Sequence, residues 1–397
     1  MITLAINRER AIKFLEKLIK QNTVNPPGNE NVIVNIISEH VRKYDLNVKI
    51  KMLTENRSNI MIELEGKKPK LRPLIFSGHL DTVPTGDIRN WKVDPFSGGV
   101  SDGKIYGRGS CDMKSGVAGL IEAMINIKES GETPEASIIF VGTAGEEVDC
   151  IGAKKIVEER SIEQAGAMVI AEPSNNRVYN THKGVLWIEI IIYGKTAHGS
   201  APSEGVNAIN HAMEVLRRLK SIKLFKNIKH DLLGRPTLNI SMIEGGVQTN
   251  VVPDQCRITI DVRTVPGIEN EKVLEEFKAV LQIAEREIKQ FRSQLNILHN
   301  LPYFCCPKHD KFLKLALDLN KKVTGIDEKE KGANYYTEGS VYYPVLGIPI
   351  IIYGPGDEQL AHQSNEYVAV EKYIEAIHYY IEIAQKYSDI SSTKMII

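Results

Sequence analysis

Apolar residues fall into short continuous runs separated by amphipathic stretches, a pattern typical of α/β proteins. Four of the runs predict buried strands: residues 73–76, 136–141, 167–170 and 348–353. Residues 113–128 and 370–387 place apolar side chains three and four positions apart, which predicts helices that flank a sheet. The chain is therefore expected to contain an α/β domain that both its beginning and its end help to form.

The pattern changes in the middle of the chain. We expect a strand over 185–194, a helix over 205–219, strands over 237–246 and 256–265, a helix over 270–290 and a further strand. This βαββαβ order indicates an inserted α+β domain at residues 182–298. The first domain would then comprise residues 1–181 and 299–397.

Composition narrows the function classes. Fifty Lys and Arg residues balance 50 Asp and Glu residues, so no cationic surface is expected for nucleic acid or an anionic membrane, and small-molecule partners are favoured. No apolar run approaches the roughly 20 residues that span a bilayer, and residues 8–19 indicate an amphipathic helix rather than a signal peptide. Five cysteines, an odd number, favour a reducing, cytoplasmic compartment.

Side chains that bind metals follow the ends of the predicted strands. They are His79 and Asp81 after the first strand, Glu146 and Glu147 after the second, Glu172 after the third and His362 after the fourth. Ligands bind outside the carboxyl ends of strands in α/β sheets, so four separate segments are expected to converge on one site.

Asp112, just before a predicted helix, adds another carboxylate to this set. Nitrogen and oxygen ligands suit zinc, cobalt or manganese, and so many carboxylates would repel one another without cations. Two ions about 3.5–4 Å apart would need one bridging carboxylate and would leave a shared water as the nucleophile. The residues thus predict a centre for two divalent metal ions.

Five motifs of the chain resemble a known family. They are GHLDTVP (78–84), GRGSCDMKSG (107–116), TAGEEVDCIGA (143–153), AEP (171–173) and AHQSNE (361–366). In this order and spacing they are similar to the acetylornithine deacetylase and succinyl-diaminopimelate desuccinylase family of dinuclear zinc amidohydrolases and peptidases. The resemblance implies a mixed-sheet, zinc-peptidase-like catalytic domain with an inserted lid and dimerisation domain.

The resemblance also implies a role for each candidate ligand. His79 and Glu172 would complete one metal site, Glu147 and His362 the other, and Asp112 would bridge the two.

Two further residues near the ligands would act without binding metal. Glu146 would be free to serve as the general base, which takes a proton from the water and hands it to the leaving amine. Asp81, two residues after a ligating histidine, is placed to accept its free N–H and fix its tautomer.

Three residues of the insert complete the implied site. His198, in GKTAHGSAP, would stabilise the developing oxyanion after reaching the site across a homodimer interface. Asn250 and Arg263 match positions that hold the oxyanion or the substrate carboxylate, for which an Arg fork is suited.

The function expected from this resemblance is hydrolysis of an N-acyl amino acid, with acetylornithine as the first candidate. His182, Lys183 and Gly184 resemble deacetylases, whereas desuccinylases carry paired arginines there. Glu338 stands where relatives carry an aspartate and is expected to line the substrate pocket.

Other functions stay open beside this one. A succinyl-diaminopimelate desuccinylase or a metal-dependent dipeptidase would use the same machinery. A non-catalytic amino-acid-binding relative would be expected to lack a ligand or Glu146, and none is missing. Cys150 as a nucleophile lacks the spaced His and Asn that would support it.

Overall fold

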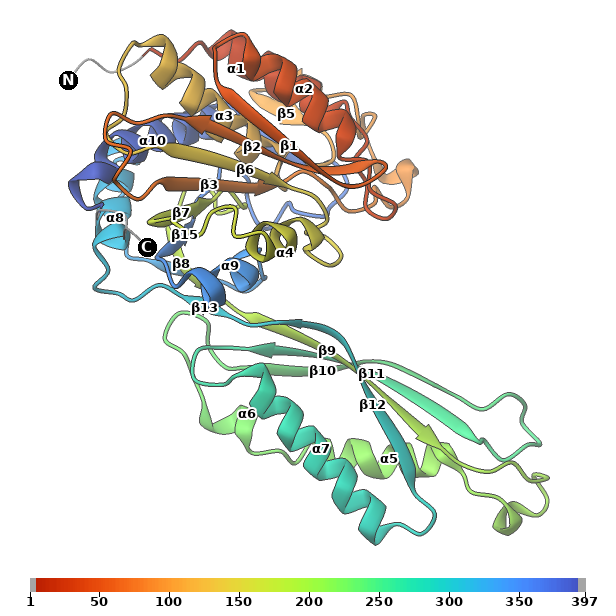
Figure 1. The fold of residues 1–397 in the computed structure, drawn as a ribbon. Helices are drawn as coiled ribbons and strands as arrows, with labels where there is room; N and C mark the ends of the chain where they lie inside the picture. Colours follow the sequence, from red (N-terminus) through yellow and green to blue (C-terminus); the bar gives the residue numbers. More distant parts are fainter. Residues whose placement is uncertain (1–4, 392–397) are drawn as a thin grey trace. The chain divides into compact units, whose positions relative to one another are not determined.

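The computed structural model describes residues 5–391, which form two compact units (Figure 1). The larger unit runs up to Thr181 and then comprises Cys305–Lys331 and the chain from Thr337 onward. The smaller unit comprises His182–Phe304 and Gly332–Tyr336. The insert end expected at residue 298 falls inside the smaller unit, because the strand there continues to Leu301 and stays paired with its neighbour.

A mixed sheet organises the larger unit. Its strand order is β1 (Asn47–Thr54), β2 (Arg57–Leu64), β6 (Ile138–Thr143), β3 (Leu74–His79), β7 (Ala167–Ile170), β15 (Ile350–Ile352), β8 (Tyr179–His182) and β13 (Phe304–Cys305), with β14 (Lys331–Ala333) paired to β8. A small second sheet joins β16 (Tyr367–Ala369), β5 (Lys104–Tyr106) and β4 (Val100–Ser101).

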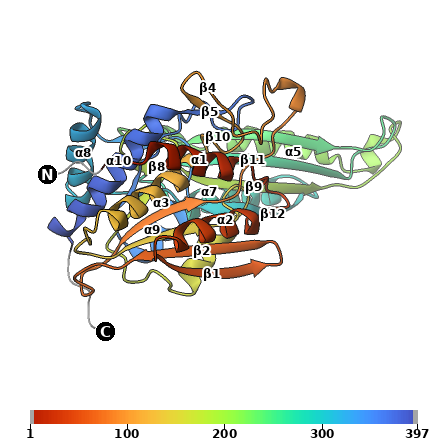
Figure 2. The same cartoon turned by 90° about the horizontal axis from the view of Figure 1, so that it is seen from above.

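Helices cover both faces of the larger sheet (Figure 1). One face carries α1 (Arg8–Ile19), α2 (Asn31–Arg42), α3 (Lys114–Glu129) and α10 (Val370–Lys386), which lie in front of the sheet in Figure 2, where the molecule is seen from above. The other carries α4 (Ile151–Glu158) and α9 (Gly339–Leu346), while α8 (Lys311–Thr324) packs on α10. Helix α3 is buried along nearly its whole length, because α1 and α10 pack against it while it contacts β3.

The four central strands β6, β3, β7 and β15 are parallel, so their carboxyl ends point toward the same edge. Each strand is apolar and almost entirely buried, as the continuous runs in the sequence indicate. Helix α3 approaches this edge closely, and a Cβ atom at Gly116 would lie 2.1 Å from the carbonyl oxygen of Ala171. Glycine at this position therefore lets α3 pack directly against the end of β7.

The smaller unit is a four-stranded antiparallel sheet with helices on one face. Its elements are β9 (Gly184–Tyr193), α5 (Ala208–Leu219), α6 (Leu224–Asn227), β10 (Thr237–Gly245), β11 (Gln255–Thr264), α7 (Asn270–Glu287) and β12 (Arg292–Leu301). The strands lie in the order β10, β11, β9, β12. Alternate residues Leu186, Ile188 and Ile190 of β9 are buried with α5 and α7 in the core of this unit. The βαββαβ order predicted for the insert is confirmed.

The hairpin of β1 and β2 at the edge of the larger sheet was not predicted from the pattern of apolar residues. Strand β1 is largely exposed and has no continuous apolar run. It is held by its antiparallel pairing with β2, which pairs in turn with β6. None of the helices within residues 5–391 has the length and apolar character that crossing a membrane requires.

Candidate metal centre

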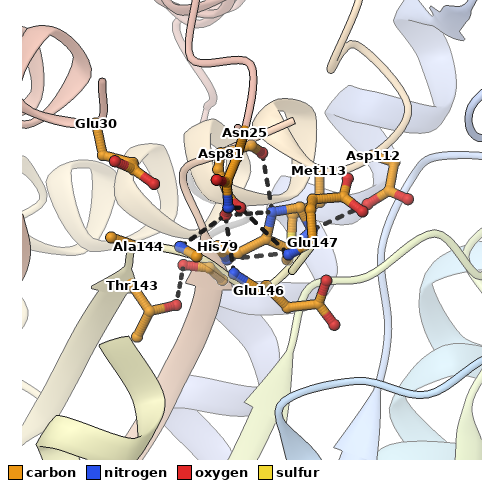
Figure 3. Close-up of polar contacts among 12 residues, drawn as sticks. Asn25, Glu30, His79, Asp81, Asp112, Met113, Thr143, Ala144, Glu146 and Glu147 are labelled. Atoms are coloured by element: carbon orange, nitrogen blue, oxygen red, sulfur yellow. Dashed lines mark hydrogen bonds and ion pairs between the residues drawn. The ribbon is translucent and has the colours of Figure 1, made fainter. Parts of the chain in front are cut away.

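His79 lies at the end of β3 and is buried, with only 1% of its surface exposed. Its ring nitrogens point in different directions (Figure 3). Nδ1 lies 3.0 Å from the carbonyl oxygen of Asp81 and 3.5 Å from its carboxylate, whereas Nε2 lies 3.1 Å from Oδ1 of Asp112. A proton on Nδ1 shared with Asp81 leaves the lone pair of Nε2 available to a metal ion.

The carboxylate of Asp81 also organises the loop after β6. It accepts hydrogen bonds from the backbone N–H groups of Gly145 and Glu146, each at 3.1 Å, and of Glu147 at 3.2 Å. The side chain of Asn25 donates to the same carboxylate at 2.8 Å. Asp81 therefore fixes His79 and the glutamate pair at once, a wider role than the sequence suggests.

Asp112 occupies the loop that leads into α3 and faces two histidines. Its Oδ1 lies 3.1 Å from Nε2 of His79, and its Oδ2 lies 3.3 Å from Nε2 of His362. The two oxygens of one carboxylate thus serve different partners, which is the arrangement required of a ligand that bridges two ions.

Two groups of candidate ligands meet at Asp112. In the first, Oε1 of Glu172 lies 3.8 Å from Nε2 of His79; in the second, Oε2 of Glu147 lies 3.4 Å from Nε2 of His362. Within each group the possible ligand atoms lie within 4.8 Å of one another. The other oxygen of Glu147 is buried and has no hydrogen-bond partner among the described residues. Two histidines and three carboxylates, one of which has an unsatisfied oxygen, fit a pair of divalent ions.

The charges of the two ligand groups also indicate a site for divalent ions. Burial by itself would lower the pKa of His79, but the carboxylates of Glu172, Asp112 and Asp81 outweigh it and raise the pKa well above its usual value. Hydrogen bonds to Asp112 and Glu147 raise the pKa of His362 to about 10. Positive charge is therefore stabilised at this edge of the sheet, and divalent cations would supply it.

Glu146 lies beside these groups and belongs to neither of them. Its exposed fraction is 5%, and its backbone is held by Asp81. Burial raises the pKa of Glu146 well above its usual value, and the nearby carboxylates of Glu147 and Asp112 raise it further, although His79 opposes them. A carboxylate with a raised pKa beside a metal centre is suited to accept and return a proton.

The three candidate residues of the insert all lie in the smaller unit, where two of them are neighbours. The backbone of His198 bridges to Val251, and the N–H of Gly199 donates to the carbonyl oxygen of Asn250 at 2.7 Å. The His198 ring is exposed, with Nδ1 2.6 Å from the Ser200 hydroxyl. The two loops that carry His198 and Asn250 therefore lie side by side.

Arg263 lies elsewhere in the same unit. It pairs with Val185 near the start of β9, whereas the His198 loop follows the end of that strand, on the order of 25 Å away at the rise of an extended chain. Its guanidinium group donates to Asp261 at 2.9 Å. Any carboxylate that Arg263 binds would therefore compete with Asp261.

The motifs assign no role to three polar residues that contact the site. Asn25, Arg108 and Glu366 contact Asp81 or the loops that carry Asp112 and His362. Arg108 and Glu366 lie inside motifs quoted above, but a motif does not show what its members touch.

The chain is similar to known proteins along most of its length. A model described as Peptidase family M20/M25/M40 matches residues 75–386. A probable succinyl-diaminopimelate desuccinylase of Staphylococcus aureus strain N315 is 29% identical, covering 96% of this chain and 98% of the relative. An acetylornithine deacetylase of Buchnera aphidicola subsp. Schizaphis graminum is 30% identical over 90% of this chain and 92% of its own.

A solved structure shares the fold. The aminopeptidase PepT of Bacillus cereus ATCC 10987 superimposes with a TM-score of 0.79 at 23% identity, covering 96% of this chain and 99% of the other.

Glu338 does not line a pocket as expected, since only 1% of its surface is exposed. It directly precedes α9. Burial raises the pKa of Glu338 to about 7, and neither oxygen of its carboxyl group has a hydrogen-bond partner among the described residues. The side chain of Glu338 is accommodated inside the protein, and its carboxyl group keeps a proton to a higher pH than an exposed glutamate does.

This burial predicts a pH-dependent cost that Glu338→Gln removes. An unfolded glutamate has a pKa of about 4.3, so the folded protein loses stability as pH rises from there to about 7, by about 4 kcal/mol in all. In urea denaturation of the metal-free protein, the free energy of unfolding of Glu338→Gln should increase relative to that of the wild type as pH rises from 5 to 8. The exposed Glu371→Gln should change little, and parallel pH profiles for wild type and Glu338→Gln would contradict the assignment.

Proposed function

Because the chain belongs to the peptidase family M20/M25/M40, we propose that it is a deacylase that hydrolyses the amide bond of an N-acyl amino acid. An acetylated amino acid resembling acetylornithine is the substrate we favour. The single observation that carries the proposal is the placement of Asp112 between His79 and His362, with Glu146 beside it outside both ligand groups.

The residues present would hold two divalent ions in a defined way. His79 and Glu172 would bind one ion, Glu147 and His362 the other, and Asp112 both. Zinc is the ion we favour, with cobalt or manganese as alternatives, because the donors are imidazoles and carboxylates. When bound, such ions polarise an amide carbonyl and lower the pKa of a water molecule.

Glu146 would move the proton. Its carboxylate would accept a proton from the attacking water and deliver it to the amine nitrogen as the amide bond breaks. The N–H of Glu146 donates to Asp81, which also contacts His79. The base and the first ligand are therefore held by one residue, which reduces the reorganisation that the reaction requires.

The smaller unit would complete the site. We propose that His198 and Asn250 stabilise the oxyanion that develops on the amide oxygen, since their loops lie together and the His198 ring is exposed. The homodimer and the lid role of this unit follow from the family resemblance and belong to the same proposal. Arg263 would bind a substrate carboxylate only by sharing its guanidinium group with Asp261.

Two features bear on the acyl group, and they favour different relatives. His182, Lys183 and Gly184 stand where desuccinylases carry paired arginines, which supports an acetyl group. Several relatives are nevertheless named as probable succinyl-diaminopimelate desuccinylases, so desuccinylation is the second candidate. A dipeptidase activity would use the same ligands and base.

The free state of all five cysteines is compatible with the cytoplasmic location that the sequence favours.

A panel of substrates tests the proposal directly. The purified protein, loaded with zinc or cobalt, is assayed for amine release from N-acetyl amino acids, N-succinyl amino acids and dipeptides, with a chelated control. Turnover of acetylated substrates that chelation abolishes supports the deacetylase. Preference for succinylated substrates supports the second candidate, cleavage of dipeptides alone makes the protein a peptidase, and metal binding without turnover supports a non-catalytic relative.

Substitutions separate the base from the bridging ligand. Glu146→Ala should lower kcat by about 100-fold to 10⁴-fold while metal content stays near two ions per chain. Asp112→Ala should lose metal as well as activity, because both groups share this carboxylate. Metal content is measured by atomic emission after gel filtration, and wild-type turnover in Glu146→Ala would falsify its assignment as the base.

His198→Ala should lower kcat about 100-fold or more while KM changes little, because the imidazole is proposed to act mainly in the transition state. His309→Ala, which removes another exposed histidine, is the matched control and should leave both constants near wild type. An unchanged kcat for His198→Ala would remove this residue from the mechanism.

A further inference from the structure

Arg108 and Glu366 form a buried ion pair to which the proposed chemistry assigns no role. The two residues lie 258 positions apart in the chain, and their side chains are 2% and 0% exposed. One guanidinium nitrogen of Arg108 donates to Oε2 of Glu366. Removing two opposite charges from water is costly, so a pair of this kind calls for compensating contacts around it.

Glu366 makes its further contacts with the loop that carries Asp112. Its Oε1 accepts hydrogen bonds from the backbone N–H groups of Cys111 at 2.8 Å and Asp112 at 3.1 Å. The carbonyl oxygen of Glu366 accepts a third from Gly107 at 3.0 Å. The backbone around the candidate bridging ligand is thus attached to Glu366.

Arg108 makes its further contacts with the loop that carries His362. Its second terminal nitrogen lies 3.4 Å from the carbonyl oxygen of His362 and donates to that of Pro84 at 3.1 Å. Its guanidinium group lies over the ring of Trp91, 5.3 Å from the centroid. The planar fork of Arg108 therefore joins Glu366 to the main chain at His362 and to the segment that follows His79.

The two ligand groups differ in how much they need such support. His79 ends β3 and Glu172 follows β7, two paired parallel strands that fix both residues. His362 lies in a loop at φ +64°, and its side chain is 51% exposed. The sheet itself thus fixes two ligands of the first group, whereas His362 depends on contacts made by its loop.

We propose that Arg108 and Glu366 are positioning residues that set the distance between Asp112 and His362, and thereby the affinity of the Asp112, Glu147 and His362 group for a metal ion. The inference rests on the proposed two-metal function. It predicts that the Arg108–Glu366 ion pair affects the binding of only one of the two metal ions.

The experiment uses full-length protein with its metal removed by a chelator and titrated with Zn²⁺ in a calorimeter. Arg108→Lys keeps the charge but cannot reach Glu366, Pro84 and His362 together, and Glu366→Gln keeps the size but loses the charge. Each should weaken one of the two binding steps by about 10-fold to 100-fold and leave the other within about twofold.

Glu122→Gln is the matched control. Glu122 is also fully buried and is paired with Arg10 at 2.8 Å, in contacts that involve none of the candidate ligands. Its variant should lose thermal stability without a change in either metal affinity. If it weakens zinc binding as much as Glu366→Gln does, the effect is general destabilisation and the proposal is wrong.

A double-mutant cycle identifies the ion that is affected. In a His362→Ala background, Glu366→Gln should weaken the remaining ion by less than about twofold, because the loop that the ion pair holds no longer supplies a ligand and the amide oxygen of the substituted side chain can still accept the N–H groups of Cys111 and Asp112. A further loss of 10-fold or more would overturn the proposal, as would unchanged affinities in both single variants. A wild type that binds fewer than two ions would instead refute the two-metal function itself.

Discussion

Repulsion among the carboxylates buried at one edge of the larger sheet is the constraint to which the rest of the site responds. Glu146 and Glu172 are almost fully buried, and Asp112 and Glu147 lie beside them. Each added carboxylate makes ionisation of the others harder, which is reflected in the pKa of Glu172, raised well above its usual value by burial and by Asp112. Such a cluster is stable only where cations or donors offset its charge.

The surrounding protein supplies part of that compensation. Asp81 is satisfied by three backbone N–H groups and Asn25, and Asp112 is flanked by two histidines. Although burial opposes it, the hydrogen bonds from His362 and His79 hold the pKa of Asp112 well below its usual value. Glu147 keeps one buried oxygen without a partner among the described residues. The protein thus satisfies the carboxylates that orient the site and leaves ligand atoms available.

The fold explains how the ligands reach one place. Parallel strands bring the segments after β3, β6 and β7 to the same edge, and Gly116 lets α3 pack closely at the end of β7. His362 reaches this edge from a loop, and Arg108 and Glu366 attach that loop to the one carrying Asp112. Strand pairing and one buried ion pair thus together position the ligands.

The sequence by itself determined the central strands of the larger unit, the βαββαβ order of the smaller unit and the identity of the candidate ligands. Apolar runs and ligand-bearing motifs are local features, and the rule that parallel strands share an edge carries them to one site. Only the tertiary structure decided which oxygen of Asp112 faces which histidine, that Asp81 holds the Glu146 loop, that Arg108 joins Glu366, and that Glu338 is buried. These features join residues tens to hundreds of positions apart, through side-chain directions and distances that no local pattern encodes.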